Sequence, residues 1–100
     1  MVEIFWTDES KKWLKEIHDY IALDSEKTAK RVIDEIVERT EILKLYPEIG
    51  QRLERWENEN IRMILYGHYR IVYRLLSKTR IDILGVYHGA LDLNRHFKLK

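Results

Sequence analysis

The hydrophobic period of the chain changes at Gly50, and this change restricts the folds available to it. Before Gly50, apolar side chains recur every three or four residues, which predicts amphipathic helices. After Gly50, apolar and polar side chains alternate, which predicts strands. Helices and strands of this kind each have an apolar side, so they must cover one another. The pattern therefore predicts an α+β fold.

Two antiparallel helices are expected before Gly50. Thr7 and Asp8 can cap the first helix, which should end near Leu23 because Asp24 and Ser25 are good caps for the second. The first apolar face consists of Trp13, Leu14, Ile17, Tyr20 and Ile21. The second consists of Ala29, Val32, Ile33, Ile36, Val37, Thr40 and Leu43. The two helices form a hairpin that must be laid against another apolar surface.

The strands are expected on both sides of this hairpin. A short β-prone run at 4–6 precedes it, and strands at 61–66, 69–76 and 81–87 follow it. Gly67-His68 fits a two-residue type II′ turn with glycine first. The near-continuous apolar runs at 71–73 and 83–86 indicate interior strands. The expected order is an N-terminal β-strand, the two-helix hairpin and a three-stranded antiparallel meander in one small sheet, with 51–60 as an exposed connection.

Hairpin geometry sets an expected register for the arginines. If Lys78 is at the centre of the second turn, Arg74 lies opposite Asp82 and Arg70 lies opposite Val86. A cross-strand Arg-Asp pair contributes up to about 1 kcal/mol and gives Arg74 a structural role. Arg70 has no acid opposite it and is the stronger functional candidate, with His88 diagonal to it.

Composition restricts the class of protein further. The chain has 100 residues and no cysteine, which fits a single domain over 1–100 without disulfides. A chain this short leaves much of its surface unburied, so we expect a homodimer or a hetero-oligomer with a partner. The basic segment 94–100 is expected to be a tail that becomes ordered on a partner or target. No run approaches the roughly 18 apolar residues that span a bilayer, so a cytoplasmic protein without membrane contact is expected.

Neither a cofactor nor a metal is expected. The 4 glycines form neither a dinucleotide fingerprint nor a phosphate-binding loop. The 4 histidines lack the spacing of metal-ligand pairs, and no acidic cluster resembles a calcium loop. The serines lie at expected caps and turns, which disfavours a serine hydrolase.

The remaining candidate activity is metal-free cleavage of the phosphodiester bonds of RNA. It needs a base, cations for the phosphorane charge and an acid for the leaving oxygen. Arg70, Tyr87 and His88 could supply such a set, and the possible bases are Glu54, Glu57 and Glu59. The alternative interpretation is that His88 closes the end of a strand and that Tyr87 packs in the sheet.

Five segments together resemble the RelE/ParE toxin family of type II toxin-antitoxin systems. They are Ile4-x-Trp6-Thr7, Tyr20-Ile21-Ala22-x-Asp24-Ser25, Leu43-x-x-Tyr46-Pro47-x-Ile49-Gly50, Tyr69-Arg70-Ile71-Val72-Tyr73-Arg74 and Ile83-Leu84-x-Val86-x-His88-Gly89-Ala90-x-Asp92. The resemblance implies a helical hairpin on a small antiparallel sheet. It also implies a toxin that arrests growth, as in plasmid stabilization systems, and a cognate antitoxin whose disordered tail folds around it.

The family has two branches, and the residues divide between them. RelE-type members cleave ribosome-bound mRNA, and Arg70, Tyr87 and His88 match that branch. ParE-type members inhibit DNA gyrase without being nucleases. Leu65 stands where many nuclease members carry an arginine, and Leu91 stands where the ParE ending usually has one. The helix junction and the His-Gly-Ala-x-Asp ending favour the ParE branch, so gyrase inhibition is the first hypothesis and mRNA cleavage the second.

A third hypothesis belongs to a different class of function. The chain could be a non-toxic binding module that acts with the antitoxin as a co-repressor of its operon. Loss of toxicity with preserved antitoxin binding would distinguish that case.

Overall fold

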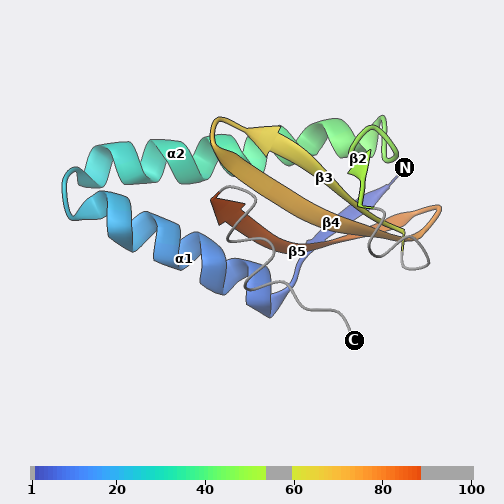
Figure 1. Ribbon diagram of the computed structural model, residues 1–100, viewed down its shortest axis with the longest axis horizontal. Helices are drawn as coiled ribbons and strands as arrows, with labels where there is room; N and C mark the ends of the chain where they lie inside the picture. Colours follow the sequence, from blue (N-terminus) through green and yellow to red (C-terminus); the bar gives the residue numbers. More distant parts are fainter. Residues whose placement is uncertain (1, 54–59, 89–100) are drawn as a thin grey trace.

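The predicted α+β architecture is confirmed by a computed structural model, which describes residues 2–53 and 60–88 (Figure 1). Its elements in chain order are β1 (Glu3–Trp6), α1 (Asp8–Ala22), α2 (Glu26–Arg39), the 3₁₀ helix η1 (Thr40–Lys44), β2 (Gln51–Arg52), β3 (Ile61–Tyr66), β4 (Tyr69–Ser77) and β5 (Arg80–His88). In Figure 1, α1 and α2 run side by side as a hairpin next to the twisted sheet.

The helices begin at two of the predicted caps. The Thr7 hydroxyl oxygen accepts a hydrogen bond from the Ser10 amide at 3.1 Å, and the Ser25 hydroxyl oxygen accepts one from the Thr28 amide at 3.1 Å. Each bond satisfies an amide that has no partner within its helix. The Thr7 hydroxyl also donates to the Ile83 carbonyl at 2.8 Å, which ties the start of α1 to β5.

The second helix is shorter than predicted. The sequence pattern predicted one helix through Leu43, but α2 ends at Arg39 and continues as η1. Thr40 is 1% exposed, so its hydroxyl needs an internal partner, and it donates to the Val37 carbonyl at 2.7 Å. A threonine bonded to the preceding turn favours the tighter 3₁₀ geometry here.

The sheet has 5 strands in the order β1-β5-β4-β3-β2, one more than predicted. β3, β4 and β5 form the predicted antiparallel meander, and the interior position of β4 and β5 is confirmed. β1 pairs in parallel with β5, up to Trp6 opposite Ile83. The prediction that 51–60 is only a connection was wrong at its start, because Gln51 and Arg52 pair with β3. A strand of 2 residues is too short to show a period.

The predicted register is correct on one side of a bulge and wrong on the other. Arg74 lies opposite Asp82 as predicted, although the Asp82 carboxylate accepts a hydrogen bond from Arg80 Nε at 2.9 Å. Arg70 lies opposite Tyr87, not Val86. The shift arises between Val72 and Tyr73, where β5 contains one extra residue, Leu84. An extra residue of this kind exchanges the faces of the side chains that follow it.

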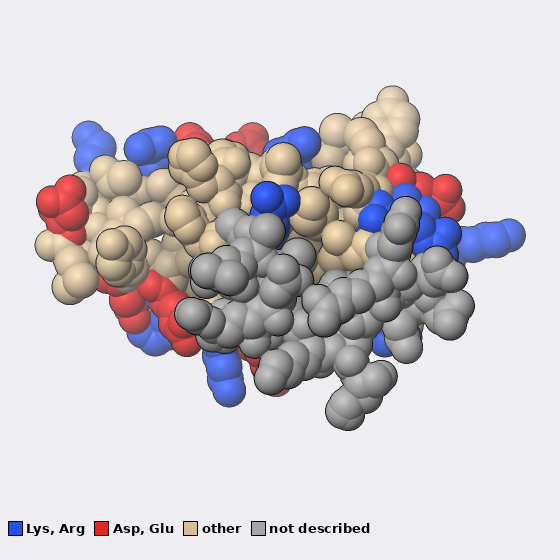
Figure 2. Space-filling model, viewed as in Figure 1, with Lys and Arg blue, Asp and Glu red and all other residues tan. Residues whose placement is uncertain are grey.

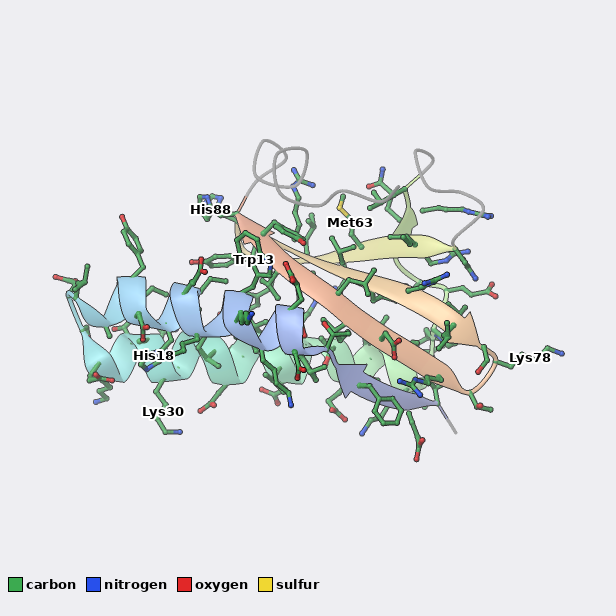
Figure 3. All side chains as sticks on the ribbon, turned by 90° about the horizontal axis from the view of Figure 1, so that it is seen from below. Trp13, His18, Lys30, Met63, Lys78 and His88 are labelled. Carbon is green, nitrogen blue, oxygen red and sulfur yellow. The ribbon has the colours of Figure 1, made fainter. Side chains whose placement is uncertain are left out.

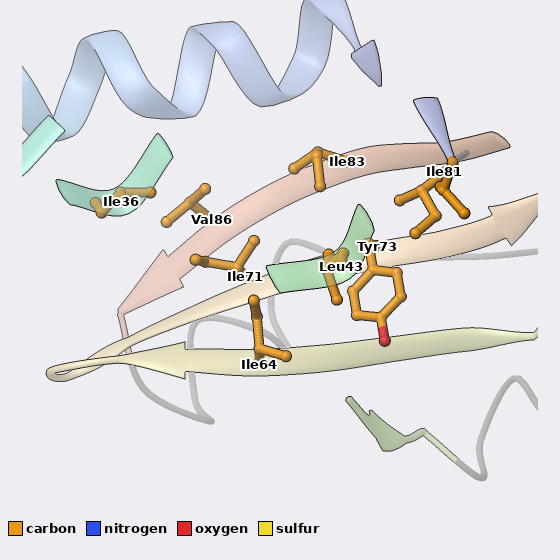
Figure 4. Packing of buried hydrophobic residues seen from close by; sticks show 9 residues of the cluster. Ile36, Leu43, Ile64, Ile71, Tyr73, Ile81, Ile83 and Val86 are labelled. Carbon is orange, nitrogen blue, oxygen red and sulfur yellow. The ribbon is translucent and has the colours of Figure 1, made fainter. Parts of the chain in front are cut away.

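The core lies between the helices and one face of the sheet. Its buried residues include Ile36, Leu43, Ile64, Ile71, Tyr73, Ile81, Ile83 and Val86 (Figure 4). A second cluster of Ile61, Met63, Val72 and Tyr87 belongs to the other face. Figure 3 shows Met63 on the side of the sheet away from the helices.

Tyr73 fixes the segment between η1 and β2 to the core. Its ring is 0% exposed, its hydroxyl donates to the Pro47 carbonyl at 2.8 Å, and it accepts from the Gly50 amide at 3.0 Å. A Cβ atom at Gly50 would lie 2.6 Å from the Tyr73 hydroxyl oxygen, so this close approach requires glycine. The turn is therefore held in one place by a buried side chain.

Candidate functional site

A hollow lies where the start of β4 and the end of β5 meet α1. Beyond Ile83, β5 has no pairing with β1, and this part of its outer edge faces α1. The hollow has a volume of about 390 Å³. It is lined from α1 by Trp13, Glu16, Ile17 and Tyr20 and from the strands by Tyr69, Val86 and His88. We call it the aromatic hollow.

The rings around the aromatic hollow are packed against one another. The His88 ring lies 5.3 Å from the Tyr69 ring in an edge-to-face arrangement, and 6.0 Å from the His68 ring. Burial raises the pKa of Tyr69, and the nearby Tyr20 hydroxyl shifts it in the same direction. Within residues 2–53 and 60–88, the Glu16 carboxylate has no ion-pair partner. The hollow is thus an aromatic surface with one free negative charge.

Arg70 and Tyr87 lie together on the other face of the sheet. Arg70 Nη1 lies 3.7 Å from the Met63 sulfur, and among the described residues its buried Nε has no hydrogen-bond acceptor. Tyr87 is 1% exposed, and its ring lies beside Gly85, where a Cβ atom would overlap the Tyr87 hydroxyl. The Tyr87 ring meets the Trp13 ring edge-on at 4.7 Å.

The protonation of Tyr87 follows from its position. Burial raises the pKa of Tyr87 to about 12, and the negative charge of Glu9 contributes in the same direction. The phenol is therefore neutral over the physiological range. A hydroxyl that is almost fully buried also has little access to a ligand in solvent.

The structure divides the three residues that the sequence suggested for RNA cleavage. Arg70 and Tyr87 are paired across β4 and β5 and share a face, whereas His88 lies opposite Tyr69 and lines the aromatic hollow. Successive side chains of a strand point to opposite faces, and the bulge at Leu84 decides which of Tyr87 and His88 faces the helices. The prediction that His88 lies diagonal to Arg70 on the same face was therefore wrong, because the bulge shifts the register by one residue.

Several predicted positions lie outside the described residues. They are Glu54, Glu57, Glu59, Leu91 and the segment 94–100.

Sequence reasoning missed the role of one side of α1. It assigned Trp13 and Tyr20 to the core-facing side of the helix, but Tyr20 is 77% exposed at the aromatic hollow. The spacing of Trp13, Glu16 and Tyr20 contained the signal, since it places a charge between two aromatic rings on one helical face. A charge in that position argues against a fully buried surface.

The described residues offer no clear metal site or membrane span. No three His, Cys, Asp or Glu side chains are grouped to hold a metal ion within residues 2–53 and 60–88. None of the helices in these ranges is long and apolar enough to cross a membrane.

Comparison with known proteins identifies the family. Residues 4–93 match the family model described as ParE toxin of type II toxin-antitoxin system, parDE. The chain belongs to the ParE toxin family. The predicted membership of the RelE/ParE group is thereby confirmed, and the chain is a toxin-type component of a type II toxin-antitoxin system. No curated protein matches the chain.

Two solved structures share the ParE fold seen here. One is from the chromosomal ParDE toxin-antitoxin system of P. aeruginosa, with a TM-score of 0.70 and 22% identity over 89% of this chain and 97% of that chain. The other is from the toxin-antitoxin complex RelBE2 of Mycobacterium tuberculosis, with a TM-score of 0.65 and 23% identity over 87% of this chain and 96% of that one. The likeness to both confirms the fold of a helical hairpin on a small sheet.

Proposed function

We propose that this ParE-family toxin arrests growth by inhibiting DNA gyrase and does not cut mRNA. The observation that argues against mRNA cleavage is the separation of His88 from Arg70 and Tyr87 by the sheet. Membership of the ParE family supports the same choice, because the ParE branch acts on gyrase without nuclease chemistry.

The positions of His88 and Tyr87 disfavour RNA cleavage. Metal-free cleavage needs a base, an acid and a cation around one phosphate, each within hydrogen-bond reach of the reacting atoms. Here His88 is exposed on one face, whereas the Tyr87 hydroxyl is buried and neutral on the other. One phosphate cannot contact both groups without a rearrangement of β5.

Induced expression in bacteria tests the choice between the two targets. We expect intact cellular messages by primer extension, inhibited supercoiling by purified gyrase, and unchanged growth arrest when His88→Ala is expressed at the same level. Cleavage within translated codons that His88→Ala abolishes would contradict the proposal. Absence of growth arrest with retained antitoxin binding would also contradict it and would support the co-repressor hypothesis.

We propose further that a cognate antitoxin neutralises the toxin and docks in the aromatic hollow. Both similar structures come from toxin-antitoxin systems. The aromatic rings suit an apolar segment, and the free Glu16 carboxylate suits a basic side chain within it. The partner is therefore expected to insert an apolar residue next to a lysine or arginine.

Paired variants of α1 test this docking site. Tyr20→Ser should weaken rescue of growth by the antitoxin encoded beside the toxin, because it removes a wall of the aromatic hollow. Leu23→Ser is the matched control, since Leu23 is 86% exposed near the same helix end but does not line the hollow. Equal rescue of the two variants would place the antitoxin elsewhere.

A further inference from the structure

The end of the molecule opposite the helix junction carries an exposed apolar knob. We define the knob as Leu45, Tyr46 and Ile49, whose side chains are 73%, 58% and 51% exposed. Figure 2 shows uncharged side chains standing out at the upper right, over the segment between α2 and β2 in Figure 1. Three large apolar side chains exposed so close together are typical of a contact surface.

The backbone below the knob is held rigidly. Besides the two hydrogen bonds to Tyr73, Arg62 Nη1 donates to the Glu48 carbonyl at 3.0 Å and to the Gly50 carbonyl at 3.1 Å. The Ile49 amide donates to the Tyr46 carbonyl at 3.1 Å. A turn fixed in this way loses little backbone conformational entropy when its side chains bind a partner.

A hollow lies directly beside the knob. Its volume is about 510 Å³, and its apolar wall includes Leu75 and Leu76, the latter 47% exposed. Pro47 and Glu48 line both this hollow and the surface of the knob, so the two features are continuous. The rest of the hollow's lining is mostly polar and includes Asn60 and Ser77, so one surface offers an apolar protrusion beside a depression with an apolar wall and a polar rim.

Two opposite charges border the same hollow. Glu48 lies on the knob side, and Lys78 projects from the turn between β4 and β5 (Figure 3). Within the described part of the chain, neither side-chain charge has an ion-pair partner, and the two are not paired with each other. The surface thus holds an acid and a base that both lack a counter-charge.

We propose that this surface is the contact between two copies of the chain in a two-fold homodimer. In such an interface residue i contacts residue j of the other copy and residue j contacts residue i. The knob of one copy then enters the hollow of the other, and each Glu48 meets the Lys78 of its partner. A second copy carries an acid and a base and a knob and a hollow on the same surface, so its charges and shape are complementary to this one. The short chain, which leaves much apolar surface exposed, supports association as well.

Charge exchange tests the contact directly. Analytical ultracentrifugation of the purified full chain should show a dimer of twice the 12.2 kDa monomer mass. Glu48→Lys and Lys78→Glu should each raise the dimer dissociation constant about tenfold or more, because like charges then face each other twice. An equimolar mixture of the two variants should form a heterodimer, because both cross-contacts regain opposite charges.

Two substitutions at the other end of the molecule serve as controls. Asp24→Lys and Lys27→Glu change the charge by the same amounts near the α1–α2 junction, and they should leave the dimer unchanged. All four positions are exposed, so circular dichroism should confirm that every variant folds. A wild-type monomer at all concentrations would overturn the proposal. Dimerisation of both single variants with wild-type affinity, or a mixture that stays monomeric, would overturn it equally.

Discussion

The substitution Tyr73→Phe should destabilise the protein by about 2 kcal/mol. It removes one oxygen atom and keeps the buried ring, so it creates almost no cavity. In the wild type, the Tyr73 hydroxyl donates a hydrogen bond to the Pro47 carbonyl and accepts one from the Gly50 amide. Each is worth about 1 kcal/mol, and the buried Gly50 amide would be left without a partner. For a domain of this size, that loss lowers the melting temperature by roughly 8–16 °C.

Thermal and urea unfolding followed by circular dichroism measure this change. Tyr46→Phe is the control, because the Tyr46 side chain is 58% exposed on the same turn and should change stability by less than about 0.5 kcal/mol. Tyr73→Phe should also weaken the dimer, since it loosens the knob. A Tyr73→Phe variant as stable as Tyr46→Phe would refute the argument that Tyr73 holds this turn.

Three other predictions concern the sheet and the core. Gly85→Ala should cost about 1–3 kcal/mol in unfolding free energy, because its methyl group would displace the Tyr87 ring; an unchanged melt would contradict that ring position. Arg70→Ala should reduce growth arrest more than Arg74→Ala at matched expression, since Arg70 holds a buried Nε without an acceptor among the described residues, whereas Arg74 already makes an interaction within the chain. Equal losses would speak against a binding role for Arg70. Ile36→Asp should abolish the cooperative melt, because it buries an unpaired charge in the core.

The pH dependence of stability gives one more prediction. The pKa of Tyr87 is raised to about 12 in the folded state, whereas an unfolded tyrosine titrates near 10. The folded state therefore favours the neutral phenol, and its contribution to stability is complete below pH 10 and is lost as the pH rises towards 12. Tyr87→Phe should show a smaller loss of unfolding free energy over this interval. Identical pH profiles for the two proteins would indicate that Tyr87 is not the group responsible.

The parts of the fold that depend on local signals could be predicted from the sequence. Thr7 and Ser25 cap their helices through bonds to residues only three positions away, and the Gly67-His68 turn has the positive φ of 57° that its glycine suggested. Alternation of apolar residues was sufficient for the meander. The parallel pairing of β1 with β5 depends on contacts across most of the chain, and no local pattern encodes it.

The candidate site was harder to predict because it depends on a bulge. A one-residue irregularity at Leu84 decides whether Tyr87 or His88 lies beside Arg70. A glycine within a strand pattern, here Gly85, indicates a bulge or a close approach, and both occur at this place. The signal was present, but its exact effect on the register depends on how the Tyr87 ring packs over Gly85.

The most direct test of the proposed function is a gyrase assay with the purified chain. Gyrase, ATP and relaxed plasmid are incubated with increasing amounts of toxin, and the products are separated before and after denaturation to detect trapped cleaved DNA. We expect inhibited supercoiling, and we expect His88→Ala to inhibit it equally. Full gyrase activity at a large excess of folded toxin, together with cleavage of ribosome-bound mRNA, would contradict the proposed function.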